Sequence, residues 1–241
     1  LNIVWFKRDL RMLDHGPLSV ACASGKILPL YILEPNLWRQ PDVSYRHFLH
    51  LQHYLSQLDN MFIEIGAKLV IKVGEALPVL KSLATRHNVK AIFSHYETWN
   101  KFSKDRDSAI RKWTDENSID WKEYQQNGVV RNLISRDGWS TLWHSHMRKK
   151  IYEVPEKIFC VSEDSDNLPS CQDMSLEFDG FEPNSNLGKI EPGIVLKSFL
   201  TERGENYQRE MSGPLLSADS CSRLSTHCLL YTSDAADDPT C

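Results

Sequence analysis

The sequence lacks the two common glycine-rich loops that hold nucleotide phosphates. It contains neither G-x-G-x-x-G nor G-x-x-x-x-G-K-[ST], so the usual dinucleotide-binding and triphosphate-binding loops are excluded. Its six cysteines form no C-x-x-C pair and show no zinc-type spacing with histidines. We therefore predict no metal site, and reduced thiols in place of a disulfide framework.

Long apolar runs and a strong charge of one sign are also missing. No run reaches the roughly eighteen apolar residues that a membrane-spanning helix needs, and the first residues do not form a signal peptide. The formal net charge of -4 provides no global basic field, so binding of nucleic acid would need a local patch. We expect a cytoplasmic, monomeric protein without membrane contact.

The sequence does contain a regular alternation of short apolar runs with amphipathic segments. Five runs have the length and composition of strands: 3–6, 27–33, 68–73, 90–94 and 119–124. Helical patterns separate them, such as the segment after Ser44 with leucines at spacings of three and four. This alternation predicts a Rossmann-like, doubly wound α/β fold with a parallel five-stranded sheet. Pro29 conflicts with an inner position for the second run, because proline cannot donate a ladder hydrogen bond.

A charged turn follows the first predicted strand. Lys7, Arg8, Asp9 and Arg11 come directly after the apolar run, at the end of the strand where open α/β sheets bind ligands. They can meet a phosphate or a carboxylate, or they can pair with another part of the same protein. We expect at least one of Arg8, Asp9 and Arg11 to pair across a domain boundary and not to bind substrate. Asp14 is placed to cap the helix that follows.

The pattern changes after residue 130. A helix bearing Trp139 and Trp143 is predicted, with Asp137 as its cap. An acidic, proline-containing stretch then loses hydrophobic periodicity, which makes residues 131–190 a helix followed by an interdomain linker. Apolar periodicity returns in residues 191–227, where the start of a second, helical domain is expected.

Four strings carry a resemblance to a known family. W-F-K-R-D-L-R followed by L-D-H-G-P-L resembles the opening signature of the photolyase/cryptochrome family, and seven contiguous residues of mixed chemistry rarely recur by chance. Q-N-G-V-V-R and R-D-G-W resemble a bacterial branch of that family and lie just after the α/β domain. The resemblance covers residues 2–227, so an N-terminal fragment of a bacterial photolyase-like flavoprotein is expected. Residues 228–241 are expected to be a non-native tail.

The resemblance implies an FAD site in the last segment. The family has a tyrosine followed by a T-S-x-L-S string that holds the flavin diphosphate, and the matching residues are Tyr207, Cys221, Ser222, Arg223, Leu224 and Ser225. Cys221 stands where the family usually has threonine and so lacks that hydroxyl. On residue chemistry alone, hydroxyls beside an arginine suit either a phosphate or the start of a capped helix.

The resemblance also implies an antenna chromophore, of folate or deazaflavin type, in residues 1–130. Pockets in such sheets favour the carboxyl ends of the strands. The residues expected to line this one are Glu34, Glu97, Asn100 and Lys101. An empty cleft is the alternative.

By resemblance, the whole protein is a blue-light flavoprotein that splits pyrimidine dimers in damaged DNA, a deoxyribodipyrimidine photo-lyase. The dimer would be flipped out of the duplex into a pocket over the flavin. The alternatives are a cryptochrome-type photoreceptor, a stand-alone nucleotide-binding α/β module, and a subunit like an electron-transfer flavoprotein. The residues that would touch the flavin ring and the dimer lie beyond the resemblance. We therefore predict no catalytic residue here, and expect the 241-residue chain neither to hold flavin nor to repair DNA.

Overall fold

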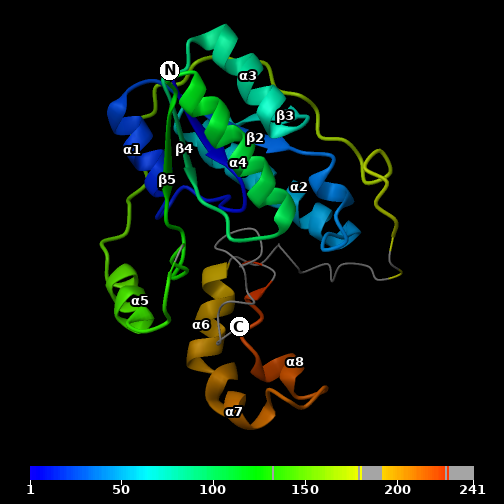
Figure 1. Ribbon diagram of the computed structural model, residues 1–241. Coiled ribbons are helices and arrows are strands. Elements are labelled where there is room, and N and C mark those ends of the chain that lie inside the picture. Colours follow the sequence, from blue (N-terminus) through cyan, green and yellow to red (C-terminus); the bar gives the residue numbers. More distant parts are fainter. Residues whose placement is uncertain (132, 179, 181–191, 226, 228–241) are drawn as a thin grey trace.

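The computed structural model describes residues 1–131, 133–178, 180, 192–225 and 227. Five strands in these residues form one sheet in the order β3-β2-β1-β4-β5, and every neighbouring pair is parallel (Figure 1). The strands are β1 (Asn2–Phe6), β2 (Ile27–Leu33), β3 (Val70–Val73), β4 (Ala91–His95) and β5 (Asp120–Tyr124). The predicted α/β fold is therefore confirmed, and the predicted strand bounds agree within two residues.

Helices cover both faces of this sheet. They are α1 (Gly16–Ser24), α2 (Tyr45–Glu64), α3 (Ala76–His87) and α4 (Lys101–Glu116). α1 and α2 pack on the face that carries Val4 and Phe6, whereas α3 and α4 pack on the face that carries Ile3 and Trp5. Because successive side chains of a strand point to opposite faces and both faces are covered, residues 3–6 of β1 are all apolar.

Pro29 lies within β2 although β2 is an inner strand of the sheet. Ile27 N donates to Phe159 O at 2.8 Å, on the side away from β1. In a strand, residues i and i+2 direct their backbone nitrogen and oxygen to the same side. The nitrogen of Pro29, two residues after Ile27, therefore also faces away from β1. On that side β3 begins opposite Leu30. The proline is tolerated because the ladder with β3 starts one residue later.

The acidic segment after residue 150 runs along β2 and β3. Val161 N donates to Ile27 O at 3.1 Å, and Asp166 N donates to Ile71 O at 2.8 Å. Ile71 N in turn donates to Ser165 Oγ at 3.0 Å. Residues 179 and 181–190 of the expected linker, and the expected tail 228–241, lie outside the described residues.

Glu163 fastens this segment to β3 and α3. Its carboxylate is 4% exposed and lies 2.9 Å from Lys72 Nζ, 2.7 Å from Arg86 Nη1 and 2.5 Å from His87 Nε2. Burial would raise the pKa of Glu163, but hydrogen bonds from these three side chains outweigh it and lower the pKa to about 2. The segment is thus held by an ionised carboxylate as well as by backbone bonds.

We expect Glu163→Gln to lose about 1–3 kcal/mol of unfolding free energy at neutral pH, because bonds to a charged acceptor are replaced by weaker ones. The pKa in the folded protein lies below the ordinary 4.5, so the stabilisation is complete above about pH 4.5 and is lost as the pH falls towards 2. Urea titrations across this range measure the difference. Glu156→Gln, at an exposed position of the same segment, is the control. A difference that persists at the acid end would contradict the assignment.

The remaining helices lie beyond the end of the sheet opposite the N-terminus (Figure 1). They are α5 (Trp139–Met147), α6 (Pro192–Thr201), the 3-10 helix η2 (Arg203–Asn206), α7 (Tyr207–Glu210) and α8 (Ser217–Ser220). The predicted cap of α5 is wrong, because Gly138 at φ 77° occupies the cap position and Asp137 instead accepts from Ser135 Oγ at 2.8 Å. None of the described helices is long and apolar enough to span a bilayer. The four described cysteines are free thiols.

Candidate functional site

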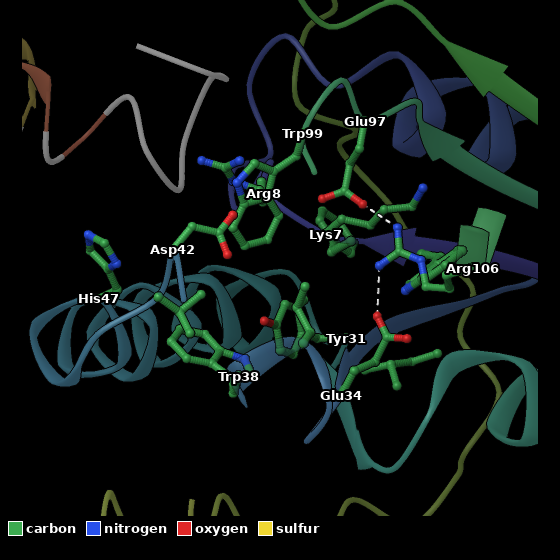
Figure 2. A pocket seen from close by; sticks show the side chains of 15 residues that line it. Lys7, Arg8, Tyr31, Glu34, Trp38, Asp42, His47, Glu97, Trp99 and Arg106 are labelled. Atoms are coloured by element: carbon green, nitrogen blue, oxygen red, sulfur yellow. Dashed lines mark hydrogen bonds and ion pairs between the residues drawn. The ribbon is translucent and has the colours of Figure 1, made fainter. Parts of the chain in front are cut away.

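A narrow cavity opens where β1, β2 and β4 end. Its walls come from the ends of β1 and β2, from the loop after β4, from the 3-10 helix η1 (Leu37–Arg39), from the start of α2 and from Arg106 of α4. Figure 2 shows Arg8 and Trp99 across the cavity from Trp38 and Tyr31. The cavity has a volume of about 630 Å³. It lies at the end of the sheet where a ligand was expected.

A buried ion cluster forms the floor of this cavity. The guanidinium of Arg106, from α4, donates to Glu34 Oε2 at 2.7 Å, to Asp107 Oδ1 at 2.8 Å and to Glu97. Burial would lower the pKa of Arg106, but these carboxylates raise it well above its ordinary value. Asp107 also lies 3.3 Å from Lys7 Nζ. The charged turn after β1 is therefore tied to α4 by an ion pair.

Glu34 connects the ion cluster to the start of α3. Its second oxygen accepts from Ala76 N, the first residue of α3, at 3.1 Å. Burial raises the pKa of Glu34, and Arg106 opposes that shift. Glu34 therefore orders three elements at once, the end of β2, the start of α3 and the middle of α4.

Trp38 lines the cavity and carries a buried polar atom. The residue is 6% exposed, and no group in the described part of the chain accepts a hydrogen bond from its Nε1. On the opposite wall the guanidinium of Arg8 stacks 4.3 Å from the ring centre of Trp99. A buried donor without an acceptor costs about 1–3 kcal/mol, so such a group is expected to have a reason for being there.

A second buried cluster joins Asp9 to two histidines. Asp9 Oδ2 accepts from His15 Nε2 at 2.9 Å and from His95 Nδ1 at 2.6 Å, and Asp9 Oδ1 accepts from Lys7 N at 2.7 Å. Burial would raise the pKa of Asp9, but the charges and hydrogen bonds of His15 and His95 hold it well below its ordinary value. Burial lowers the pKa of His15 to about 4, so its ring is neutral at pH 7.

Within the described residues, Asp9, His15 and His95 are the group whose atoms could converge on a metal ion. The hydrogen bonds argue against that use. His15 Nδ1 accepts from Leu18 N at 3.0 Å, so the ring proton sits on Nε2, the atom that faces Asp9. A protonated nitrogen has no lone pair for a cation, and the cluster is closed as a hydrogen-bonded unit.

This arrangement corrects the expected helix cap. Asp14 does not cap α1; the cap is His15, whose side chain accepts the helix N–H. Asp14 has a left-handed φ of 51°, and its carboxylate instead accepts from Tyr152 N at 3.1 Å. The left-handed backbone at Asp14 thus places His15 where its ring can accept from Leu18 N and donate to Asp9.

The structure brings only some of the predicted antenna residues together. Glu34 and Glu97 line the cavity and meet on Arg106. Asn100 instead caps α4 by accepting from Ser103 N at 3.0 Å, and Lys101 is exposed beside Asp105; both line a neighbouring groove over α4. Whether any of the four binds a chromophore stays a prediction.

The predicted flavin residues lie at the start of α7 and directly after α8. Tyr207 begins α7, and its ring packs edge-on against Phe199 with 5.6 Å between centres. The residues Cys221, Ser222, Arg223, Leu224 and Ser225 follow α8 directly. Arg223 has a left-handed φ of 63° and donates to Ala218 O. Their role in holding flavin likewise stays a prediction.

Sequence reasoning missed Trp38, Arg106 and Asp107. Arg106 and Asp107 lie in a helix that is polar along most of its length, so their burial has no local signal. Trp38 follows a loop, where an aromatic residue is easily taken for surface.

Comparisons with known proteins agree with this geometry. The DNA photolyase family model matches residues 2–135. The chain is 31% identical over 117 residues to the deoxyribodipyrimidine photo-lyase of Salmonella typhimurium, covering 46% of this chain and 24% of that protein. It is 32% identical over 110 residues to the chloroplastic/mitochondrial cryptochrome DASH of Arabidopsis thaliana, covering 41% of this chain and 18% of that protein.

Among solved structures, the archaeal photolyase of Sulfolobus tokodaii has the same fold. The TM-score is 0.66 at 24% identity, and the match covers 95% of this chain and 51% of that one. The chain thus spans about half the length of that structure, and its alignments span about a quarter or less of the two curated relatives.

Proposed function

Since the chain belongs to the DNA photolyase family, together with the cryptochromes, we propose that it is part of a blue-light flavoprotein that binds FAD and splits pyrimidine dimers in damaged DNA. FAD, when bound, supplies the photoexcited electron. The observation that carries the proposal is the family match over residues 2–135, on a parallel sheet with a cavity at its carboxyl end. The protein is proposed to be monomeric and cytoplasmic.

The parts of the chain have separate roles in this proposal. Residues 1–130 form the antenna-binding α/β domain, and residues 131–190 form a helix and the interdomain linker. Residues 191–227 begin the helical FAD-binding domain. Helices α6 to α8 support this division, because they pack with one another and lie away from the sheet (Figure 1).

The proposed contacts to the FAD diphosphate come from Tyr207, Ser222, Arg223 and Ser225. Hydroxyls and a guanidinium are the donors that a diphosphate accepts. Three or four such bonds contribute about 0.5–1.5 kcal/mol each, whereas association costs about 4–15 kcal/mol in lost freedom. Residues 191–227 alone therefore do not retain flavin, and the ring systems must be buried by further protein.

The test compares the 241-residue chain with a full-length protein made from the complete reading frame. The full-length protein is expected to be yellow, with about one FAD per chain, and to repair pyrimidine dimers under blue light. The 241-residue chain is expected to be colourless. In the full-length protein, Ser222→Ala with Arg223→Ala should weaken flavin retention, whereas Ser212→Ala with Arg209→Ala, at exposed positions of the same segment, should not.

Other outcomes separate the alternatives. Bound FAD without dimer repair would favour a cryptochrome-type photoreceptor. A full-length protein that binds neither FAD nor damaged DNA would leave a nucleotide-binding α/β module. Stoichiometric FAD in the 241-residue chain would contradict the contact argument given above.

The cavity is the proposed antenna site, for a chromophore of folate or deazaflavin type. Its walls include the aromatic rings of Trp5, Phe6, Tyr31, Trp38 and Trp99. We propose that a carbonyl or ring nitrogen of the ligand accepts from Trp38 Nε1, which has no acceptor among the described residues. The name of the Sulfolobus tokodaii structure reports two FAD molecules and a novel light-harvesting cofactor in that protein. An antenna in the present protein is consistent with it.

Trp38→Phe tests this site in the full-length protein. We expect occupancy by the second chromophore to fall about two- to tenfold, the equivalent of one hydrogen bond, as measured by near-ultraviolet absorbance beyond that of flavin. The chromophore-free protein should not lose stability from the missing hydrogen bond, because Nε1 has no partner there. Trp113→Phe, in α4 and in the core on the face of the sheet that carries Ile3 and Trp5, controls for the loss of ring volume. Absence of a second chromophore after gentle purification would favour the empty cleft.

A further inference from the structure

Arg203 uses its whole guanidinium within the protein. An arginine side chain has five N–H donors, and each of those of Arg203 has an acceptor. The acceptors are Ser198 Oγ at 3.0 Å, Val195 O at 3.1 Å, Asp219 O at 3.5 Å, Cys221 O at 2.5 Å and Ser222 O at 3.2 Å. No donor remains for a ligand, so the side chain organises structure and does not bind phosphate itself.

These bonds join two segments that are distant in sequence. Val195 and Ser198 belong to α6, whereas Cys221 and Ser222 open the loop after α8. The guanidinium lies between them and draws both carbonyls of the loop to one side. The loop contains the residues proposed to hold the FAD diphosphate.

The direction of these carbonyls fixes the direction of two backbone N–H groups. In a trans peptide the C=O and the following N–H point opposite ways, and the described chain has no cis peptide bond. With the carbonyls of Cys221 and Ser222 turned to Arg203, the N–H groups of Ser222 and Arg223 point away from it. Arg223 has a left-handed φ of 63°, the backbone form in which successive N–H groups make a concave nest for anions.

We propose that Arg203 is a positioning residue that holds the 221–225 loop with two backbone N–H groups turned outward for an anionic diphosphate. The inference rests on the proposed flavin function. Holding the loop in its binding form before the ligand arrives lowers the entropy cost of association. Loss of Arg203 should therefore weaken flavin binding although Arg203 does not touch the flavin.

The test uses three variants of the full-length protein and titration of the apoprotein with FAD, well below the unfolding temperature. Arg203→Met is expected to weaken FAD binding tenfold or more, and Arg203→Lys, which keeps the charge and three donors, to restore part of it. Arg209→Met is the matched control, because Arg209 is three-quarters exposed and contacts only its neighbours Asn206 and Glu210 among the bonds described. Its dissociation constant should stay within about twofold of wild type.

Hydrogen exchange of the apoprotein is a second, flavin-independent readout. The amides of Ser220 and Cys221, which donate to Leu216 O and Ser217 O where the loop begins, should exchange faster in Arg203→Met than in Arg209→Met, while those of β1 and β4 stay protected in both. A lower melting temperature with an unchanged FAD dissociation constant would overturn the proposal, as would unchanged exchange of these two amides. Failure of the wild-type protein to bind FAD would instead refute the proposed function, and the exchange experiment would still decide whether Arg203 holds the loop.

Discussion

Replacing Arg106 by methionine is expected to lower the free energy of unfolding by about 3–5 kcal/mol, the usual result of removing one partner from a buried ion cluster. The side chains of Arg106, Glu34 and Glu97 are 6%, 2% and 6% exposed. Without the guanidinium, these carboxylates and Asp107 face one another in a largely buried site. Methionine fills much of the volume of the arginine side chain, so the lost free energy of unfolding reflects the missing charge more than a packing defect.

Urea denaturation at several pH values measures this prediction. The carboxylates left behind would have raised pKa values in the folded state, so folding would take up protons. The deficit of Arg106→Met should therefore be largest near pH 8 and should shrink as the pH falls towards 5. Lys112→Met, on the same helix, removes an exposed cation 3.9 Å from Glu116 and should cost about 0–1 kcal/mol. A loss that does not depend on pH would show that packing, not the ion cluster, accounts for it.

The second large effect is expected for Asp9→Asn, at about 3 kcal/mol. Asp9 accepts three hydrogen bonds, from Lys7 N, His15 Nε2 and His95 Nδ1. An asparagine side chain has one oxygen, so its NH₂ group must face either the backbone N–H or the two histidines. His15 cannot adapt by moving its proton, because Leu18 N occupies Nδ1. A buried donor is left opposite another donor in either orientation.

Asp14→Asn is the matched control for this variant. It removes one charge from the same turn, but the asparagine oxygen can still accept from Tyr152 N, and asparagine tolerates the left-handed φ of 51°. Its unfolding free energy should stay within about 0.5 kcal/mol of wild type. Nitrogen NMR of His15 should show the proton on Nε2 in the wild-type protein. Equal stability of Asp9→Asn and Asp14→Asn would contradict the role assigned to Asp9.

The architecture could be predicted from sequence because its signals are local. The apolar run at 27–33 and the alternation of strand and helix patterns indicate the parallel sheet without knowledge of any partner. Strand order has no such signal, since β1 neighbours both β2 and β4 through contacts between distant residues. Pro29 shows what local signals cannot predict. A proline fits within β2 only because β3 begins to pair at Leu30, and the sequence around Pro29 does not indicate this.

The candidate site could be predicted only in outline. The position of a ligand cavity at the carboxyl ends of the strands follows from the fold class, and Glu34 and Glu97 lie there. The buried position of Arg106 depends on carboxylates supplied by three separate segments, and no window of sequence contains them all. The charges of Lys7 and Asp9 were visible, whereas their partners, Asp107 and two histidines, became apparent only in three dimensions.

The segment from Phe159 to Asp166 has a consequence for the behaviour of the protein in concentrated solution. β3 is an outermost strand, and an outermost strand with free backbone groups is a template for pairing with another copy of the chain. Ser165 and Asp166 occupy those groups on Ile71 and Val73. At the other edge of the sheet, β5 carries Asp120, Lys122 and Glu123, whose charges disfavour pairing with a strand of another copy. A redesign of this acidic segment as a simple flexible tether would leave the helices intact and expose the protein to aggregation.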